Sequence, residues 1–129
     1  MKRILLALTI LLGFQSLAFS QGLPAPSLWQ NQRGSTLEVF YVDPAGPFRG
    51  QFTNQAAGFQ CKGIPYPATG TVRGVAVTFV VSFVQCTSQT TWTGSVSGNK
   101  MRTRWVLIYT PPSGPPQRLT GSDLFTRVR

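Results

Sequence analysis

The sequence predicts an all-β fold, and more narrowly an eight-stranded antiparallel up-and-down β-barrel that forms a single domain. Three observations predict it. Glycine and proline divide the chain into strand-length pieces about every eight to twelve residues, which is typical of sandwiches and barrels. No segment shows the period of an amphipathic helix. The connections between successive strands are short, so each strand should pair with its chain neighbours, and about eight such strands can close around one small ligand.

The expected strands alternate in residue type and are bounded by turn residues. They run over about 28–32, 35–42, 47–54, 68–73, 75–84, 88–97, 100–110 and 117–128. The turns between them contain Asp43-Pro44-Ala45-Gly46, Arg73-Gly74, Ser97-Gly98-Asn99 and the proline-rich stretch TPPSGPPQ. The long connection is 55–67, which carries Cys61 and the PYP stretch.

The first twenty residues, MKRILLALTILLGFQSLAFS, have the pattern of a secretory signal peptide. Two cations precede an apolar run of about ten residues, and a small-x-small cleavage pattern closes the segment at Ala18-Phe19-Ser20. The apolar run is too short and wrongly flanked to anchor the chain in a bilayer. We therefore expect a signal peptide over 1–20, cleaved near Ser20, and a secreted or periplasmic barrel over 21–129 with no membrane partner.

The charge of the chain is strongly basic. Without residues 1–20, ten of the twelve Lys and Arg residues and all three acids remain, which gives a net charge of +7. Such a balance can indicate nucleic acid or an anionic surface as a partner. Here the cations are spread along an exported chain, so we expect them to provide solubility and expect no nucleic-acid partner.

The cysteine count indicates a single disulfide. Cys61 and Cys86 are the two cysteines of the chain, and an even count in an exported protein favours their pairing. The closed loop of about 26 residues would contribute roughly 3–4 kcal/mol to stability in the chain-entropy model. Two cysteines without any histidine do not make an ordinary zinc site, so we expect no metal.

Strand parity predicts which side chains face the interior of the barrel. One face of KMRTRWVLIYT carries Lys100, Arg102 and Arg104. These cations must lie outside, so Trp105 and Leu107 point inward. By the same rule Glu38 faces outward in GSTLEVFYV, which puts Ser35 on the inner face.

Several polar side chains share the predicted inner faces with apolar ones. SQTTWTG places Ser88, Thr90 and Trp92 on one face, and GSDLFTRVR places Asp123 and Phe125 together. Burying a polar group without a partner costs about 1–3 kcal/mol. These groups either recognise a ligand or bond one another and the backbone near a barrel end, and the pattern alone leaves both interpretations open.

The sequence contains few side chains that could act in catalysis. The chain has no histidine, and of its three carboxylates only that of Asp123 is predicted to face inward. One carboxylate cannot form an acid–base pair, and Ser88 has no base to activate it. We therefore do not expect an enzyme.

Several sequence blocks resemble the avidin and streptavidin family. They are WQNQRGS at 29–35, SQTTWTG at 88–94, TRWVL at 103–107 and GSDLFTRV at 121–128, in family order and at family spacing. A further block, FQCKGIPYPATGTV, together with Cys86, resembles the short-chain dimeric, rhizavidin-like avidins, in which a disulfide ties the long loop after the third strand to the end of the fifth. The resemblance covers essentially all of 21–129. It implies an avidin-like barrel that binds biotin at its open end and uses no cofactor.

The resemblance assigns roles in reading the ureido ring of biotin. Asn31 and Ser35 match the donors to the ureido oxygen. Asp123 matches the carboxylate that accepts one ureido N–H, a charge-assisted hydrogen bond. Asn54 stands where many members have a serine that accepts the other ureido N–H, and the rhizavidin-like group also has an asparagine there.

The remaining roles concern the sulfur, the tail and the apolar body of the ligand. Thr90 matches the hydroxyl that faces the thioether sulfur, and Ser88 matches the hydroxyl that reaches the valerate carboxylate. The apolar walls match Trp92, Trp105 and Leu107, and the loop that closes over the tail contains Ala57 and Gly58.

Two wall positions depart from the family pattern. Phe52 stands where the family usually has a tyrosine that donates to the ureido oxygen, and loss of that hydroxyl should weaken binding by about 1–3 kcal/mol, or roughly 5- to 150-fold. Phe83 stands where the family usually has a tryptophan wall, so it offers less contact area. We therefore expect biotin binding weaker than that of the tightest family members.

The sequence also predicts a homodimer. The linker 110–118 lacks the tryptophan that tetrameric members send into a neighbouring site. In VTFVVSFV both faces are apolar, as expected for a strand that another subunit covers from outside.

The expected function is capture of biotin without chemistry on it. The alternative is an avidin-like barrel with a drifted pocket that serves another small ligand or a protein contact. In that case the cationic face at Lys100, Arg102 and Arg104 would be the working surface, although a solvated face is the simpler interpretation of those residues.

Overall fold

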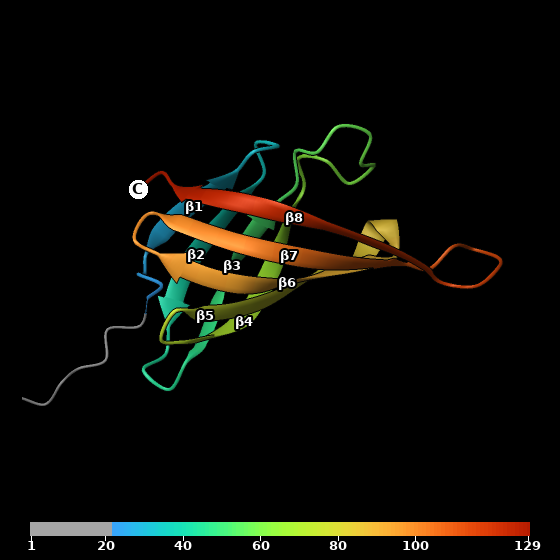
Figure 1. Ribbon diagram of the computed structural model, residues 1–129. Helices are drawn as coiled ribbons and strands as arrows, with labels where there is room; N and C mark the ends of the chain where they lie inside the picture. The colour runs from blue at the N-terminus through green and yellow to red at the C-terminus, as the bar shows by residue number, and fades with distance from the viewer. Residues whose placement is uncertain (1–21) are drawn as a thin grey trace, which may run out of the picture.

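The computed structural model describes residues 22–129, which form a closed antiparallel barrel in which every strand pairs with its neighbours in the chain (Figure 1). The strands are β1 (Ser27–Asn31), β2 (Thr36–Val42), β3 (Pro47–Thr53), β4 (Pro65–Arg73), β5 (Ala76–Phe83), β6 (Ser88–Ser97), β7 (Lys100–Tyr109) and β8 (Gln117–Arg127). Pairing of β1 with β8 closes the sheet. The predicted fold class is confirmed, and the predicted signal peptide lies outside the described residues.

Burial along the strands follows the predicted parity. Met101 and Thr103 of β7 are buried, while the cations at 100, 102 and 104 are exposed. On β2, Leu37 and Val39 are fully buried, and Ser35, just before the strand, is 1% exposed. The inward face of these segments is therefore set by the alternation that the sequence carries, which on β2 ends at a bulge between Val39 and Tyr41.

Strand β4 begins earlier than predicted, at Pro65 instead of residue 68. Pro65 pairs with Thr53 and Pro67 with Gln51 on β3, whereas pairing with β5 begins only at Ala68. The first part of β4 thus has one neighbour, and a proline without an N–H is tolerated where one edge of a strand is unpaired. The other strand ends agree with the prediction or differ from it by one residue.

A short 3-10 helix, η1 (Val84–Cys86), joins β5 to β6 where the prediction continued the strand to residue 84. The backbone reverses within this turn, and Thr87 adopts a left-handed conformation with φ of 46°. No helix in the described part of the chain is long and apolar enough to cross a membrane.

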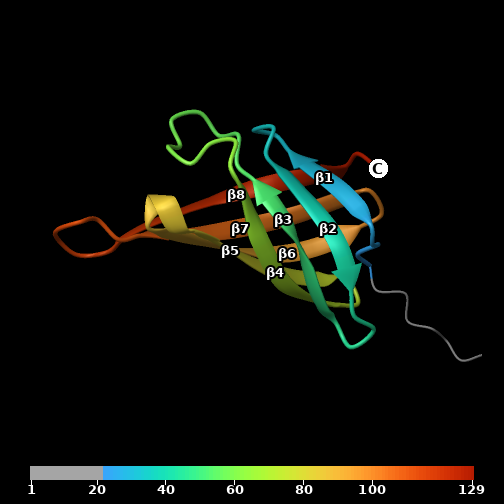
Figure 2. The same cartoon turned by 180° about the vertical axis from the view of Figure 1, so that it is seen from behind.

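The two ends of the barrel differ. The β1–β2, β3–β4, β5–β6 and β7–β8 connections emerge at one end, while the described N-terminal residues and the C-terminus lie at the other (Figures 1 and 2). The first end carries the long 54–64 loop, η1 and the 110–116 loop, so it is the end with material to enclose a ligand.

Aromatic rings fill the middle of the barrel. Phe79 stacks on Trp92 with ring centroids 4.7 Å apart, and Phe52 lies 4.6 Å from the same Trp92 ring. Phe125 meets Phe52 and Phe79 edge to face at 6.5 and 6.1 Å. This cluster of rings, the aromatic plug, closes the interior on the side away from the loops. A cavity can therefore open only toward the end of the barrel that bears the loops.

Candidate ligand-binding site

A cavity of about 330 Å³ lies above the aromatic plug at the loop-bearing end. Its lining combines apolar and aromatic side chains with a few polar ones, which is the usual composition of a small-molecule site of this size. The lining residues are Asn31, Arg33, Ser35, Phe52, Asn54, Ala56, Ala57, Gly58, Phe59, Thr90, Trp92, Trp105, Leu107, Leu119 and Asp123.

Asp123 supplies the carboxylate of the cavity. It is 5% exposed, and its Oδ2 accepts a hydrogen bond from Nε1 of Trp92 at 2.9 Å. Its Oδ1 accepts from Nε2 of Gln32 at 3.0 Å and from Nη1 of Arg33. Thr103 Oγ1 donates to the Asp123 carbonyl at 3.0 Å, which fixes the backbone beneath the side chain. The carboxylate is therefore held in one orientation by three side chains, on a backbone that Thr103 fixes.

The turn between β1 and β2 orients two further polar groups. Asn31 Oδ1 accepts from the backbone N–H of Arg33 at 3.0 Å and of Ser35 at 2.9 Å, so its amide N–H groups remain as donors for a ligand. Ser35 Oγ accepts from the N–H of Gln55 at 2.8 Å, which leaves its hydroxyl hydrogen free to donate. Gly34, at φ +84°, supplies the left-handed residue that this turn requires.

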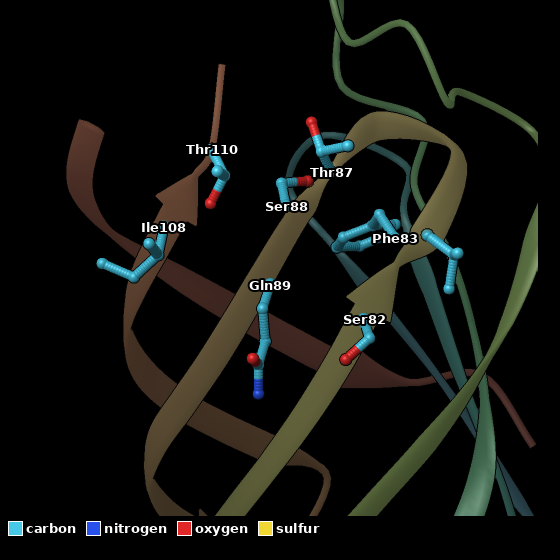
Figure 3. A pocket seen from close by; sticks show the side chains of 8 residues that line it. Ser82, Phe83, Thr87, Ser88, Gln89, Ile108 and Thr110 are labelled. Atoms are coloured by element: carbon cyan, nitrogen blue, oxygen red, sulfur yellow. The ribbon is translucent and has the colours of Figure 1, made fainter. Parts of the chain in front are cut away.

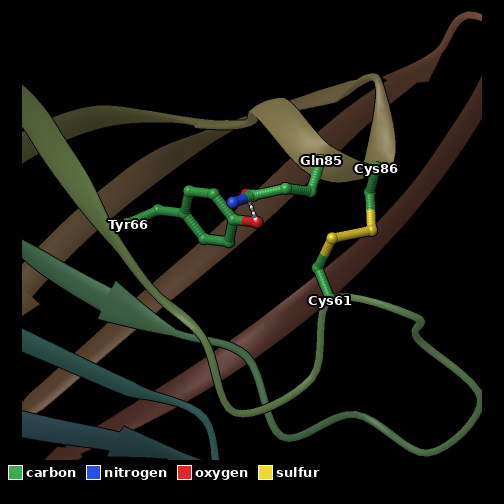
Figure 4. The surroundings of a disulfide bond; sticks show 4 residues. All are labelled: Cys61, Tyr66, Gln85 and Cys86. Carbon is green, nitrogen blue, oxygen red and sulfur yellow. Dashed lines mark hydrogen bonds between the residues drawn. A yellow bond between two sulfur atoms is a disulfide. The ribbon is translucent and has the colours of Figure 1, made fainter.

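The loop 54–64 forms one side of the cavity and is tied down at both ends. Asn54 Oδ1 accepts from the N–H of Ala56 at 2.8 Å, and Asn54 O accepts from the N–H of Gly63 at 2.8 Å. The predicted disulfide between Cys61 and Cys86 is present and joins the loop to η1 (Figure 4). Beside it, the Tyr66 hydroxyl donates to Oε1 of Gln85.

Three buried polar atoms have no hydrogen-bond partner among residues 22–129. They are Ser88 Oγ, Thr90 Oγ1 and Trp105 Nε1. Thr90 and Trp105 line the cavity. Ser88 lies at the start of β6, beside Phe83 and Thr110, and lines two pockets next to the cavity (Figure 3). For Ser88 and Thr90 the described residues thus show no hydrogen bond to another side chain or to the backbone, which was one of the two interpretations left open above.

A glycine makes room for the largest apolar wall. A Cβ atom on Gly121 of β8 would lie 2.3 Å from Cζ2 of Trp105, so the indole can rest against β8 only because residue 121 has no side chain. Trp105 pairs with Trp92 on β6, and Leu107 pairs with Thr90 in the same register. The two indoles thus lie side by side on adjacent strands, and Leu107 lies next to Trp105 on the same face of β7.

Most residues that the sequence singled out come together in this one cavity. Those that line it are Asn31, Ser35, Phe52, Asn54, Ala57, Gly58, Thr90, Trp92, Trp105, Leu107 and Asp123. Phe83 does not: it is fully buried behind the wall, with its ring 5.0 Å from Phe59 and 6.1 Å from Phe52. Ser88 borders the adjoining pockets at the mouth.

Sequence reasoning missed four lining residues, which are Arg33, Ala56, Phe59 and Leu119. Leu119 could have been found from register, because it pairs with Leu107 on the inner face. Arg33 sits between two predicted site residues on a tight turn, and no pattern shows where its long side chain goes.

Comparison with known proteins places the chain in a family. The profile of the Avidin family matches residues 21–128. Afifavidin of Afifella pfennigii is 38% identical over 117 residues, which cover 83% of this chain and 72% of the relative. A solved bradavidin2–biotin complex is 50% identical with a TM-score of 0.78 and covers 83% of this chain and 100% of that one. A rhizavidin–biotin complex is 40% identical with a TM-score of 0.75 and covers 82% and 93%. The chain belongs to the avidin family, whose members are biotin-binding proteins and not enzymes.

Proposed function

We propose that this chain captures biotin, without chemistry on the ligand, in the cavity at the loop-bearing end. The observation that carries the proposal is the pair of buried hydroxyls, Ser88 Oγ and Thr90 Oγ1, that have no partner among residues 22–129. A folded protein rarely leaves such groups unpaired, so they are best explained as contacts reserved for a ligand. The solved biotin complexes of two related proteins support biotin as that ligand.

The ureido ring of biotin would lie against the polar floor of the cavity, which is formed by Asn31, Ser35, Asn54 and Asp123. The amide N–H groups of Asn31 and the hydroxyl of Ser35 would donate to its oxygen, while Asp123 and Asn54 would accept from its two N–H groups. Asn54 Oδ1 already accepts from Ala56, but a carbonyl oxygen has a second lone pair for the ligand. Because these groups are already held by hydrogen bonds in the free protein, little ordering is left for binding.

The rest of the ligand would lie between apolar walls. Trp92, Trp105 and Leu107 would contact its body, and Thr90 would face the thioether sulfur. Ser88 would reach the carboxylate of the tail near the mouth. The 54–64 loop would cover the tail through Ala57 and Gly58, both of which are exposed in the ligand-free protein.

We further propose that the affinity is lower than in the tightest family members. Phe52 has no hydroxyl to donate to the ureido oxygen. Phe83 is too short to reach the cavity and acts only as support behind Phe59 and Phe52. Phe52→Tyr should therefore tighten biotin binding by about 5-fold or more. Competition calorimetry decides this, and an unchanged or higher dissociation constant contradicts it.

The protein is proposed to act outside the cytoplasm. The N-terminal pattern of residues 1–20 and the Cys61–Cys86 disulfide both support export. N-terminal sequencing of the exported protein should find a chain that starts near Gln21.

Isothermal titration of the oxidised barrel with biotin tests the function. Asp123→Ala should weaken binding by about 2 kcal/mol or more, because it removes a charged hydrogen-bond acceptor from a desolvated site. Lys100→Ala is the control, since Lys100 lies on the outer face and should leave binding unchanged. Absence of heat and of any thermal shift at millimolar biotin would contradict capture and favour a drifted pocket.

A further inference from the structure

Arg33 lies inside the site and has no role in the scheme above. Its side chain leaves the β1–β2 turn and donates from Nη1 to Oδ1 of Asp123. Its guanidinium carbon also lies 5.7 Å from the centroid of the Trp105 ring. Both partners line the cavity. The cation therefore lies between Asp123 on the polar floor of the cavity and Trp105 on its apolar wall.

The two ends of Arg33 are held very differently. Its backbone N–H bonds Asn31 Oδ1 at 3.0 Å, inside the hydrogen-bonded β1–β2 turn. Its side chain is 40% exposed, whereas that of Asp123 is 3% exposed. A half-exposed ion pair contributes little net free energy, since water and salt compete for it. The side chain can therefore leave while the turn stays in place.

The guanidinium has the same recognition pattern as a cyclic urea. Each is a planar carbon centre flanked by nitrogens that carry N–H donors. Asp123 has about four acceptor positions, and Gln32, Trp92 and Arg33 fill three of them. An N–H of a ligand that approaches Oδ1 thus meets the position that Arg33 occupies, over the Trp105 ring that Arg33 covers.

We propose that Arg33 is an internal placeholder for the ureido group of the ligand, and therefore a specificity-determining residue. The inference rests on the proposed biotin function. In the empty protein Arg33 fills one acceptor position on Oδ1 of the buried Asp123 carboxylate, and a ligand whose N–H bonds Oδ1 must displace the guanidinium. A small cyclic urea binds weakly, because it makes no further contacts that offset the free-energy cost of displacing Arg33. A ligand that also packs against the apolar walls offsets that cost.

The test uses imidazolidin-2-one, the neutral cyclic urea that corresponds to the ureido ring. Arg33→Leu should bind it about 3- to 20-fold more tightly than the unaltered protein, the range expected from one half-exposed ion pair and one cation–π contact. Arg102→Leu is the matched control, because it removes an equal charge from the outer face. It should bind the cyclic urea as the unaltered protein does.

Salt and a guanidinium probe supply two further readouts. Raising ionic strength from about 0.01 M to 1 M shortens the Debye length from about 30 Å to 3 Å. This should tighten urea binding by the unaltered protein and leave Arg33→Leu unchanged. In Arg33→Ala, millimolar methylguanidinium should occupy the vacated position and compete with the cyclic urea, while in Arg102→Ala it should not compete.

The outcomes separate the two proposals. Thermal unfolding first confirms that each variant is folded. Urea binding that is equal or weaker in Arg33→Leu, or no competition by methylguanidinium in Arg33→Ala, overturns the placeholder and leaves biotin capture standing if the unaltered protein binds biotin. Failure of both the unaltered protein and Arg33→Leu to bind biotin overturns both.

Discussion

Two threonines on neighbouring strands show how a hydroxyl that we propose as a ligand contact differs from a structural hydroxyl in this barrel. Thr90 on β6 is 3% exposed, and its hydroxyl has no partner in the described chain. Thr103 on β7 is 5% exposed and donates to the backbone of Asp123 at 3.0 Å. The residue type and the burial are alike, but only the second hydroxyl contributes to the stability of the empty protein.

The contrast predicts opposite effects of one substitution. Thr90→Val replaces an unpaired buried hydroxyl with a methyl group of the same shape, so it should raise the free energy of unfolding of the ligand-free protein by about 1–2 kcal/mol. The same change should weaken biotin binding by about 2- to 10-fold, since the contact to the thioether sulfur is lost. Denaturant unfolding and calorimetry measure the two effects.

Thr103→Val is the matched control, because it deletes a hydroxyl that is already bonded. It should lower the free energy of unfolding by about 1 kcal/mol. If Thr90→Val also destabilises the ligand-free protein, its hydroxyl has a structural partner in solution, and the main support for a reserved ligand contact is lost.

The 54–64 loop is the longest connection that lines the cavity. It contributes Ala56 to Phe59 to the cavity, and the disulfide attaches it to η1. The Phe59 ring packs edge to face on Phe83 at 5.0 Å. One covalent and one aromatic contact thus hold the loop in place in the ligand-free protein.

The double variant Cys61→Ser with Cys86→Ser should loosen this loop. Its free energy of unfolding should fall by roughly 3–4 kcal/mol, the chain-entropy estimate for a cross-link between residues 25 apart. Biotin should dissociate about 10-fold faster, because the loop must then be ordered during binding. Stopped-flow displacement measures the rate, and reductant added to the double variant is the control. Equal dissociation rates with and without the disulfide would show that the loop is held by packing alone.

At the scale of single strands, alternation predicted correctly which side chains face inward, whereas residue types alone did not predict where every strand begins or how far each side chain reaches. The inward direction of Trp105 and Ser35 followed from the outward charges beside them, because a strand has two faces and a charge fixes one. The early start of β4 was missed because Pro65 and Pro67 indicate a turn unless it is known that this edge is unpaired. The depth that the Phe83 ring reaches, and the direction of the Arg33 side chain, depend on tertiary partners that no single strand pattern contains.

Across the whole molecule, the outer surface of β5 to β7 carries an uncharged row that fits the predicted homodimer. Val80, Thr91 and Val106 are paired in register on adjacent strands, and all three are half-buried even in the single chain. Neighbouring outward positions on β7 hold exposed cations instead. A second copy placed over this row would bury apolar surface.

Light scattering on the oxidised barrel should therefore give twice the mass of one chain at micromolar concentration. Val106→Lys places an unpaired charge at one end of the row and should yield a monomer, because an unpaired charge buried at an interface costs several kcal/mol. Val75→Lys is the control: Val75 is 60% exposed between β4 and β5, at the end of the barrel away from the site, and should leave the mass unchanged. A monomeric mass for the unaltered protein contradicts the dimer, and a dimeric mass for Val106→Lys shows that the two copies meet elsewhere.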